Sequence, residues 1–347
     1  MFKNINFYKL NVEIFIFLFF LIIMGLNSNN LDYLNYKETY DILIHVKGFE
    51  FAYLYLQKIF NYIGFNFFQF RFTIYFILLI FLHKYVKIYL KETKYFYVLY
   101  FLYPFFLDNI EIRNFIGMVI LMYSFLFYGK TIKKKLISVI LILIASMFQN
   151  IYVIFILYPF FYSASKRKKG ILILGGIISI FLMLCPKVTI IILQWILINI
   201  LGDPKRIHYI NKISSSNIGV IVPVCLQCLN FFISYYEIKE LKSIKNISLK
   251  YKQIIECIYN LNLYLFLFLA LYRLNSQFYR ILQNIYPMMH ICFLISINYL
   301  SKNKKNFLKK IYIVYICIIF LYVILISHFK DIFISTFVNN YLLMIFK

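Results

Sequence analysis

Long apolar segments separated by lysine clusters constrain what this chain can fold into. Runs of about 20 mostly apolar residues are long enough to cross a bilayer as helices, and such runs recur from residues 10–26 to residues 311–327. Of the 347 residues, 63% are hydrophobic and 14% are charged. A soluble domain of this length could not bury so much apolar surface. The sequence therefore predicts an all-α, polytopic membrane protein with one integral membrane domain over residues 1–347.

We expect about 11 membrane segments, counted from apolar length and from the loops that separate them. They are expected at about 10–26, 68–90, 95–107, 114–128, two arms within 136–163, 170–186, 218–236, 254–271, 283–300 and 311–327. Two loops between segments are expected to be extracytoplasmic: 27–66, with an interfacial helix over Phe51 to Ile63, and 202–217. An amphipathic piece at 188–201 carries Trp195.

Lysine clusters set the expected orientation, because positively charged loops remain in the cytoplasm. The clusters lie at 84–94, 130–135, 166–169, 239–252 and 302–310. They share one side only if 136–163 enters the membrane and returns, turning near Gln149 and Asn150. A re-entrant loop and two tilted helices both fit this segment. The N-terminus is then cytoplasmic and the C-terminus extracytoplasmic.

The arginines are distributed differently from the lysines. Of six arginines, only one falls in a cytoplasmic cluster; the other five are Arg71, Arg113, Arg206, Arg273 and Arg280. Arginine grips phosphate or carboxylate with two parallel hydrogen bonds, whereas lysine is a point charge. We interpret the outer arginines as an anion-binding set; the alternative is a chance distribution.

Two groups of polar residues lie beside apolar runs. Asp108, Glu111 and Arg113 separate two hydrophobic segments, where they either face a polar site or serve as helix caps and a salt bridge. Arg273 and Arg280 are seven residues apart and share one helix face if the helix is continuous.

The sequence contains no motif typical of a metal site, a phosphate-binding loop or a nucleophilic serine. The five histidines form no metal-binding spacing, and there is no phosphate-binding glycine loop or G-x-S-x-G nucleophile. The six cysteines lie in apolar runs, where they are expected to pack as small hydrophobes. We attribute the net charge of +24 to topology rather than to nucleic-acid binding. No metal and no cofactor is expected.

Several stretches resemble the EpsG family of Wzy-like exopolysaccharide and capsule polymerases. They are Asp32, Tyr36 and Tyr40, the run 48–54, Arg113 at the start of a segment, the break at 145–149, and the region of Arg273. Relatives commonly carry a Phe-His pair at that break, where this chain has Gln149. Glutamine can donate to a sugar hydroxyl or phosphate but cannot accept a proton near neutral pH.

The resemblance implies a GT-C-like architecture and a glycosyltransferase of the bacterial cytoplasmic membrane. The enzyme would join undecaprenyl-diphosphate-linked oligosaccharide repeats at the outer face of the bilayer, alongside other polysaccharide-assembly proteins. Another membrane glycosyltransferase or ligase, a flippase of lipid-linked oligosaccharides and a non-catalytic assembly subunit are the alternatives. The implied catalytic residues are Arg113, Glu111 and Glu50, and the implied substrate-binding residues are Arg273, Arg280, Gln149, Asp32, Tyr36 and Arg206.

Topology gives the first test. In a variant without native cysteines, Arg206→Cys should react with a membrane-impermeant maleimide added to intact cells, and Lys245→Cys should react only after permeabilisation. The opposite labelling pattern would reverse the orientation and remove the argument for an outer arginine set.

Overall fold

The computed structural model describes residues 7–28, 30, 32–42, 50–127, 129, 131–162, 166–199, 217–244, 246–326 and 336–337. These residues form helices and no strand. The α-helices are, in order, α1 Phe7–Gly25, α2 Tyr33–Ile42, α3 Phe51–Tyr62, α4 Phe67–Tyr89, α5 Lys94–Leu102, α6 Phe105–Ile110, α7 Ile112–Ser124, α8 Ile132–Phe148, α9 Lys166–Leu184, α10 Pro186–Asn199, α12 Asn217–Lys242, α13 Leu249–Leu265, α14 Leu269–Leu274, α15 Arg280–Gln283, α16 Tyr286–Tyr299 and α17 Lys302–Ile326. Short 3-10 helices are η1 Phe125–Phe127, η2 Asn150–Phe155, η3 Tyr158–Phe160, η5 Phe266–Phe268 and η6 Ser276–Tyr279.

Three stretches in the described residues are long and apolar enough to cross a membrane. They are α4, Gly219–Lys242 within α12, and Leu249–Leu274 from α13 to α14. The segments α9 and α10 form a further candidate, with a bend of 110° between them. Shorter apolar helices cover Val12–Gly25, Ile112–Phe127 and Asn150–Phe160. The expected all-helical class and membrane-helix character are confirmed, and the total of about 11 segments stays a prediction.

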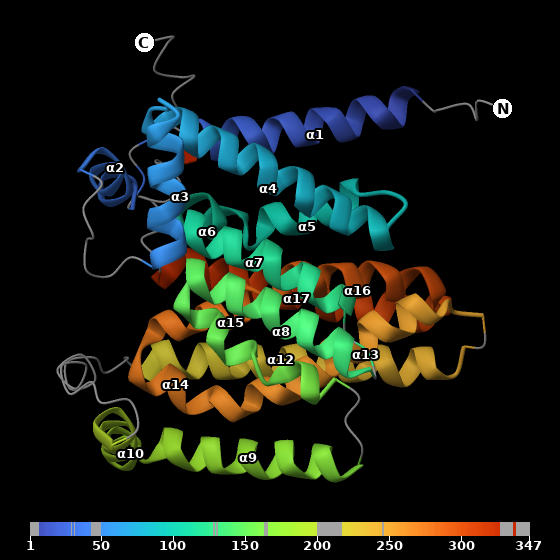
Figure 1. Cartoon of the computed structure of the whole chain (residues 1–347). Helices are drawn as coiled ribbons and strands as arrows, with labels where there is room; N and C mark the ends of the chain where they lie inside the picture. Colours follow the sequence, from blue (N-terminus) through green and yellow to red (C-terminus); the bar gives the residue numbers. More distant parts are fainter. Residues whose placement is uncertain are drawn as a thin grey trace.

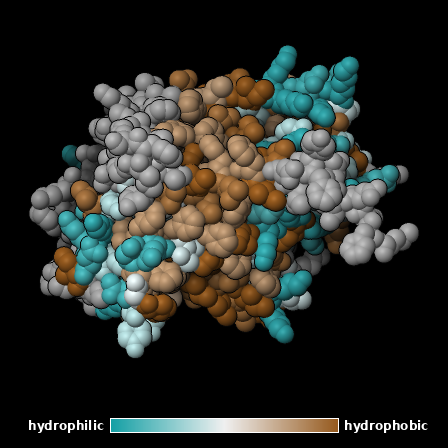
Figure 2. All heavy atoms as spheres, turned by 90° about the horizontal axis from the view of Figure 1, so that it is seen from above, coloured by the Kyte–Doolittle hydropathy of each residue, from teal (hydrophilic) through white to brown (hydrophobic). Residues whose placement is uncertain are grey.

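The long helices lie roughly parallel in layers, from α1 and α4 at the top of Figure 1 to α9 at the bottom. Their outer surface is apolar. Phe15 on α1, Phe81 on α4 and Phe181 on α9 are exposed. Figure 2, seen from above, shows a broad hydrophobic band with hydrophilic residues gathered toward both ends of the molecule. Such a band is the surface that lipid solvates.

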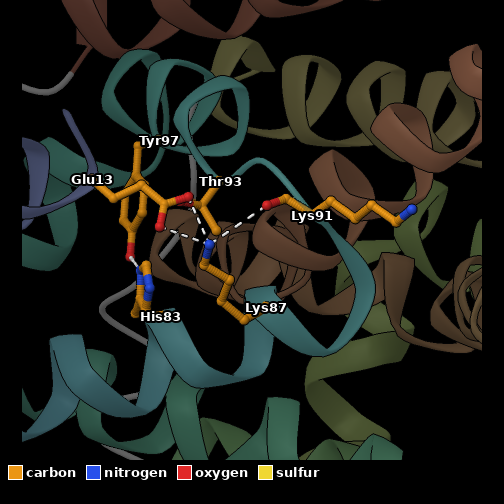
Figure 3. Close-up of polar contacts among 6 residues, drawn as sticks. All are labelled: Glu13, His83, Lys87, Lys91, Thr93 and Tyr97. Carbon is orange, nitrogen blue, oxygen red and sulfur yellow. Dashed lines mark hydrogen bonds and ion pairs between the residues drawn. The ribbon is translucent and has the colours of Figure 1, made fainter. Parts of the chain in front are cut away.

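One end of the bundle is rich in lysine, and we call it the lysine end. Here the turn from α4 to α5 is tied to α1: Lys87 Nζ lies 2.7 Å from Glu13 Oε2, and the Thr93 hydroxyl donates to the same carboxylate (3.2 Å) (Figure 3). Lys304 at the start of α17 pairs with Glu240 at the end of α12. Since α4 has 23 residues, its opposite end lies about 33 Å away.

The other end carries the first loop, folded as two short helices. A helix is present over the expected range as α3, its interfacial position stays a prediction, and α2 packs against α3 and α4. Gly64 (φ 91°) lets the chain reverse after α3, and Asn66 and Gln69 then form a reciprocal capping box at the start of α4. In Figure 1, α3 runs across the ends of the long helices. The loop therefore covers that end of the bundle.

The segment 136–163 doubles back. Helix α8 ends at Gln149, which has an extended backbone, and the chain continues as η2 and η3, both packed on α8. Lys135 near the start of α8 lies 5.8 Å from the centre of the Phe160 ring at the end of η3. A hairpin with its turn at Gln149 and Asn150 fits this geometry, and its returning arm is 3-10 rather than α-helical.

The chain breaks between two expected segments and within a third. Leu274 ends α14, the chain is extended at Asn275, and a new helix begins at Arg280. The condition for Arg273 and Arg280 to share one helix face, a continuous helix between them, is therefore not met. Residues 105–110, expected partly as the end of a segment, form the separate helix α6.

The hairpin packs on α7 through a glycine. The Tyr152 hydroxyl donates to the carbonyl oxygen of Asn114 (2.7 Å), which lays its ring over Gly117. A Cβ at Gly117 would come within 2.1 Å of that ring, closer than real Cβ contacts allow. The close approach of α7 and η2 therefore requires glycine at this position.

Replacing this glycine should destabilise the fold. Gly117→Ala is expected to lower stability by about 1–3 kcal/mol, the usual cost of overpacking. Gly170→Ala is the matched control, because nothing lies within 4 Å of its Cβ position in α9. Thermal unfolding in detergent measures both, and equal midpoints for the two variants would contradict the packing argument.

Candidate functional site

Glu50 joins three segments at the loop-covered end of the bundle. It stands at the N-cap position of α3, and its Oε2 forms an ion pair with Nη1 of Arg113 at the start of α7. The backbone N–H of Asn150, at the hairpin turn, donates to Glu50 Oε1 (3.2 Å). Both carboxylate oxygens are thus occupied. Residues far apart in the sequence meet here because α3 lies across the bundle end.

Tyr36 on α2 completes this contact. Arg113 Nε donates to the Tyr36 hydroxyl oxygen (3.2 Å), and the guanidinium lies 5.4 Å from the ring centre. Gln57 on α3 donates to the Tyr36 carbonyl oxygen (3.1 Å), which fixes α2. Burial raises the pKa of Tyr36 to about 12, although Arg113 acts in the opposite direction. The hydroxyl therefore stays neutral at physiological pH.

A second arginine–acid pair lies on neighbouring segments. Arg280 begins α15, and its Nη2 and Nε lie 2.7 and 3.0 Å from Glu111 Oε1. Glu111 stands in the connection between α6 and α7, two residues before Arg113. Its Oε2 is buried and has no hydrogen-bond partner in the described part of the chain. Such an unsatisfied oxygen is costly and requires water or a ligand.

The surroundings of Glu111 favour its neutral form. Burial raises the pKa of Glu111, Arg280 opposes that change, and Asp32 adds to it. Asp32 therefore contributes to the electrostatics of the same site. A carboxylate held above its ordinary pKa is a stronger proton acceptor.

The two pairs are partly shielded from water. The side chains of Arg113 and Glu50 are 17% and 8% exposed, and those of Arg280 and Glu111 are 21% and 10% exposed. Each arginine thus retains a reachable edge. Helix α15 also packs against η2, so the Arg280 pair adjoins the hairpin. We call Tyr36, Glu50, Glu111, Arg113 and Arg280 the arginine site.

Three predicted substrate-binding residues, Gln149, Arg273 and Arg206, are not part of the arginine site. Gln149 immediately precedes Asn150, whose amide contacts Glu50, so it borders the arginine site. Arg273 lies in the last turn of α14, on the far side of the break at Asn275. Arg206 and residues 202–216 of the predicted loop 202–217 lie outside the described residues, and residue 217 begins α12. The roles predicted for these residues stay predictions.

Two expectations about charged residues were wrong. Asp108 does not face a polar rim: it is fully buried, and the Tyr100 hydroxyl (2.7 Å) and Gln283 Nε2 (3.0 Å) donate to its carboxylate. Asn109, the expected N-cap, also does not cap α7, because it lies inside α6; Glu111 stands at the N-cap position of α7, near the positive helix end, without a capping hydrogen bond.

Arg71 likewise serves the fold rather than an outer anion. It is fully buried on α4 and donates to the backbone carbonyls of Met24 (3.2 Å) and Asn109 (2.7 Å). The Tyr75 hydroxyl also donates to the Asn109 carbonyl (3.0 Å). These contacts connect the start of α4 to α1 and to α6, and α6 is followed immediately by Glu111 of the arginine site.

Nothing in the sequence indicated the amide of Asn150 as a partner of Glu50, since backbone donors have no residue signature. Nor did it indicate the Gln283 contact to Asp108. Among the described residues, no three His, Cys, Asp or Glu side chains lie close enough together to hold a metal ion.

Comparison with known proteins supplies the family. The family model described as the EpsG family matches residues 11–343, nearly the whole chain. The chain belongs to the EpsG family. No curated protein and no solved structure matched it in the corresponding searches. The resemblance that the sequence suggested is therefore confirmed, and the family match supports a polysaccharide-related membrane protein. Within this EpsG-family chain, the match includes every residue of the arginine site.

The pairing of Arg113 with Glu50 can be tested by a double-mutant cycle. The double variant should lose less stability than the sum of the losses in the single variants Arg113→Met and Glu50→Gln. The expected coupling free energy is about 1–3 kcal/mol. Unfolding in detergent provides the free energies. The pair Arg113 and Glu92, at opposite ends of the bundle, is the control and should show additive effects; equal coupling in both cycles would refute the contact.

Proposed function

We propose that this protein is a polysaccharide polymerase that joins lipid-diphosphate-linked oligosaccharide repeats at the outer face of the bacterial cytoplasmic membrane. The proposal rests on the EpsG-family match and on one observation: two arginines, each held by a carboxylate, share one end of the bundle. The substrate would be an undecaprenyl-diphosphate-linked repeat, and the architecture would be GT-C-like with about 11 membrane segments.

The arginine site suits the departure of a diphosphate. In the proposed step, a hydroxyl oxygen of one repeat bonds to the anomeric carbon of another chain, and the bond from that carbon to the diphosphate breaks. The bonding electrons leave with the polyprenyl diphosphate. Arg113 and Arg280 are positioned to stabilise the charge that develops there, since fixed donors in a partly dry site require little reorganisation. Gln149 and Arg273 would extend the contacts to sugar and phosphate.

The two carboxylates are suited to different roles. Both oxygens of Glu50 are engaged, one by Arg113 and one by the Asn150 amide, so Glu50 would orient Arg113. Glu111 has a buried oxygen without a partner and a raised pKa. We assign Glu111 as the group that accepts the hydroxyl proton.

Orientation supports an enzyme at the outer face. Lys87, Lys250 and Lys304 lie near the lysine end, where the positive-inside rule places the cytoplasm. The arginine site then faces outward, where a lipid-linked repeat would already have been flipped. Substrates would enter at one rim of the protein, as a transferase needs, rather than at the middle of the bundle, where transporters bind.

Loss of either arginine should stop chain growth. In cells, Arg113→Gln and Arg280→Gln are each expected to reduce polymer by at least about 100-fold, the effect of removing one charge-stabilising donor. Single lipid-linked repeats should then accumulate on the outer face. Lys58→Gln, on the exposed side of α3, is the control and should give normal chain length. Normal chains in both arginine variants at wild-type protein abundance would refute the site, and repeats retained on the inner face would indicate a flippase.

The base assignment predicts a pH dependence. As the pH falls through the raised pKa of Glu111, its carboxylate takes up a proton and the rate should decline. Glu111→Gln should lose about 10²–10⁴ of the rate, the usual contribution of a general base. Transfer by purified protein with a synthetic lipid-linked repeat measures both effects. A Glu111→Gln variant that keeps both its rate and its acid limb would move the role to Glu50.

A further inference from the structure

A large groove opens at the lysine end of the bundle, and the arginine site lies at the other end. Its volume is about 820 Å³. It lies between the turn after α4, the start of α5, the start of α13, the end of α16 and the start of α17. The lining residues that carry the argument are Lys91, Lys305, Lys309, Val98, Phe293 and Ile313.

The groove changes from cationic to apolar along its length. Lys305, Lys309 and Ile313 are spaced four residues apart on α17 and therefore share one face. Moving along that face into the bundle, two ammonium groups give way to an aliphatic side chain. Phe293 on α16 and Val98 on α5 continue the apolar wall. The charge lies at the end of the bundle and the apolar wall lies within its length.

A third lysine lies at the cationic part. The Lys91 carbonyl oxygen accepts a hydrogen bond from Lys87 (3.5 Å), while its side chain extends away from the cluster around Glu13 (Figure 3). Glu92 also lines the groove, but it lies 3.5 Å from Lys94 Nζ, which offsets its charge. The cationic part therefore keeps a net positive charge.

The apolar part is open to the side of the bundle. Val98 and Ile313 are 59% and 62% exposed. On a chain with this apolar outer surface, such residues contact lipid tails, so the groove is continuous with the bilayer. A ligand that satisfies both parts must carry an anion at one end and hydrocarbon at the other.

We propose that this groove binds one membrane lipid with an anionic phosphate headgroup. The phosphate lies against Lys91, Lys305 and Lys309, and the upper part of an acyl chain lies along Val98, Phe293 and Ile313. The volume is within the range of small-molecule sites. Lysine suits a headgroup of variable geometry because it acts as a flexible point charge. The inference is independent of the glycan transfer proposed above.

Native mass spectrometry of the purified full-length chain tests this site with phosphatidylglycerol as the probe. The wild-type protein should bind one phosphatidylglycerol more tightly than phosphatidylcholine, whose headgroup has no net charge. The double substitution Lys305→Gln and Lys309→Gln should weaken binding about 30-fold, since each basic residue near an anionic headgroup contributes about fivefold. Val98→Trp, which fills the apolar part from an exposed position, should also weaken binding.

Matched controls separate this site from general attraction to anions. The double substitution Lys302→Gln and Lys310→Gln removes the same charge from α17 outside the groove and should leave binding unchanged. Inorganic phosphate in excess should not displace the lipid, because it lacks the apolar part. Equal loss in the two double variants, equal affinity for phosphatidylcholine, or displacement by inorganic phosphate would each overturn the proposal.

Discussion

The cost of leaving a charge unpaired in an apolar bundle organises this protein. A buried charge is tolerated only when a partner and further hydrogen bonds satisfy it. Arg71 stays inside the bundle, where backbone carbonyls accept from its Nε and Nη2 and the Tyr75 ring lies 5.0 Å away, while its buried Nη1 has no hydrogen-bond partner among the described residues. Arg113 and Arg280 meet that requirement with carboxylates at the bundle end, where water or a substrate can compete. The fully buried arginine and the two partly exposed arginines therefore differ in the identity and exposure of their partners.

Much of this architecture follows from patterns that the sequence displays directly. Apolar length predicted the helices at α4, α12 and α13, and the break at Gln149 predicted where the hairpin turns. The contacts between side chains far apart in the sequence could not be predicted from these patterns. Arg113 and Glu50 are 63 positions apart, and nothing local specifies that α3 crosses the bundle end. The seven-residue spacing of Arg273 and Arg280 places them on one face only in a continuous helix, and the chain breaks at Asn275.

The molecule uses its two kinds of cation for different physical tasks. At one end, arginines are held in fixed geometry by acids and a tyrosine ring. At the other end, lysines project from helix starts and turns, and several of them line an open groove. Rigid, bidentate donors favour a defined anion, whereas mobile ammonium groups accept any nearby phosphate. If both proposals hold, the defined anion and the membrane lipid bind at opposite ends of the bundle.

The shared carboxylate of Glu50 has a mechanical consequence. One oxygen restrains Arg113 and the other restrains the turn of the hairpin through Asn150. An anion that attracts Arg113 away from Glu50 therefore changes the hydrogen bond between Glu50 and Asn150 at the hairpin turn. In the same way, a shift of the hairpin changes the ion pair between Glu50 and Arg113. By linkage the two effects are equal in free energy. Binding of an anion at Arg113 and the position of the hairpin are thus coupled through a single side chain, Glu50.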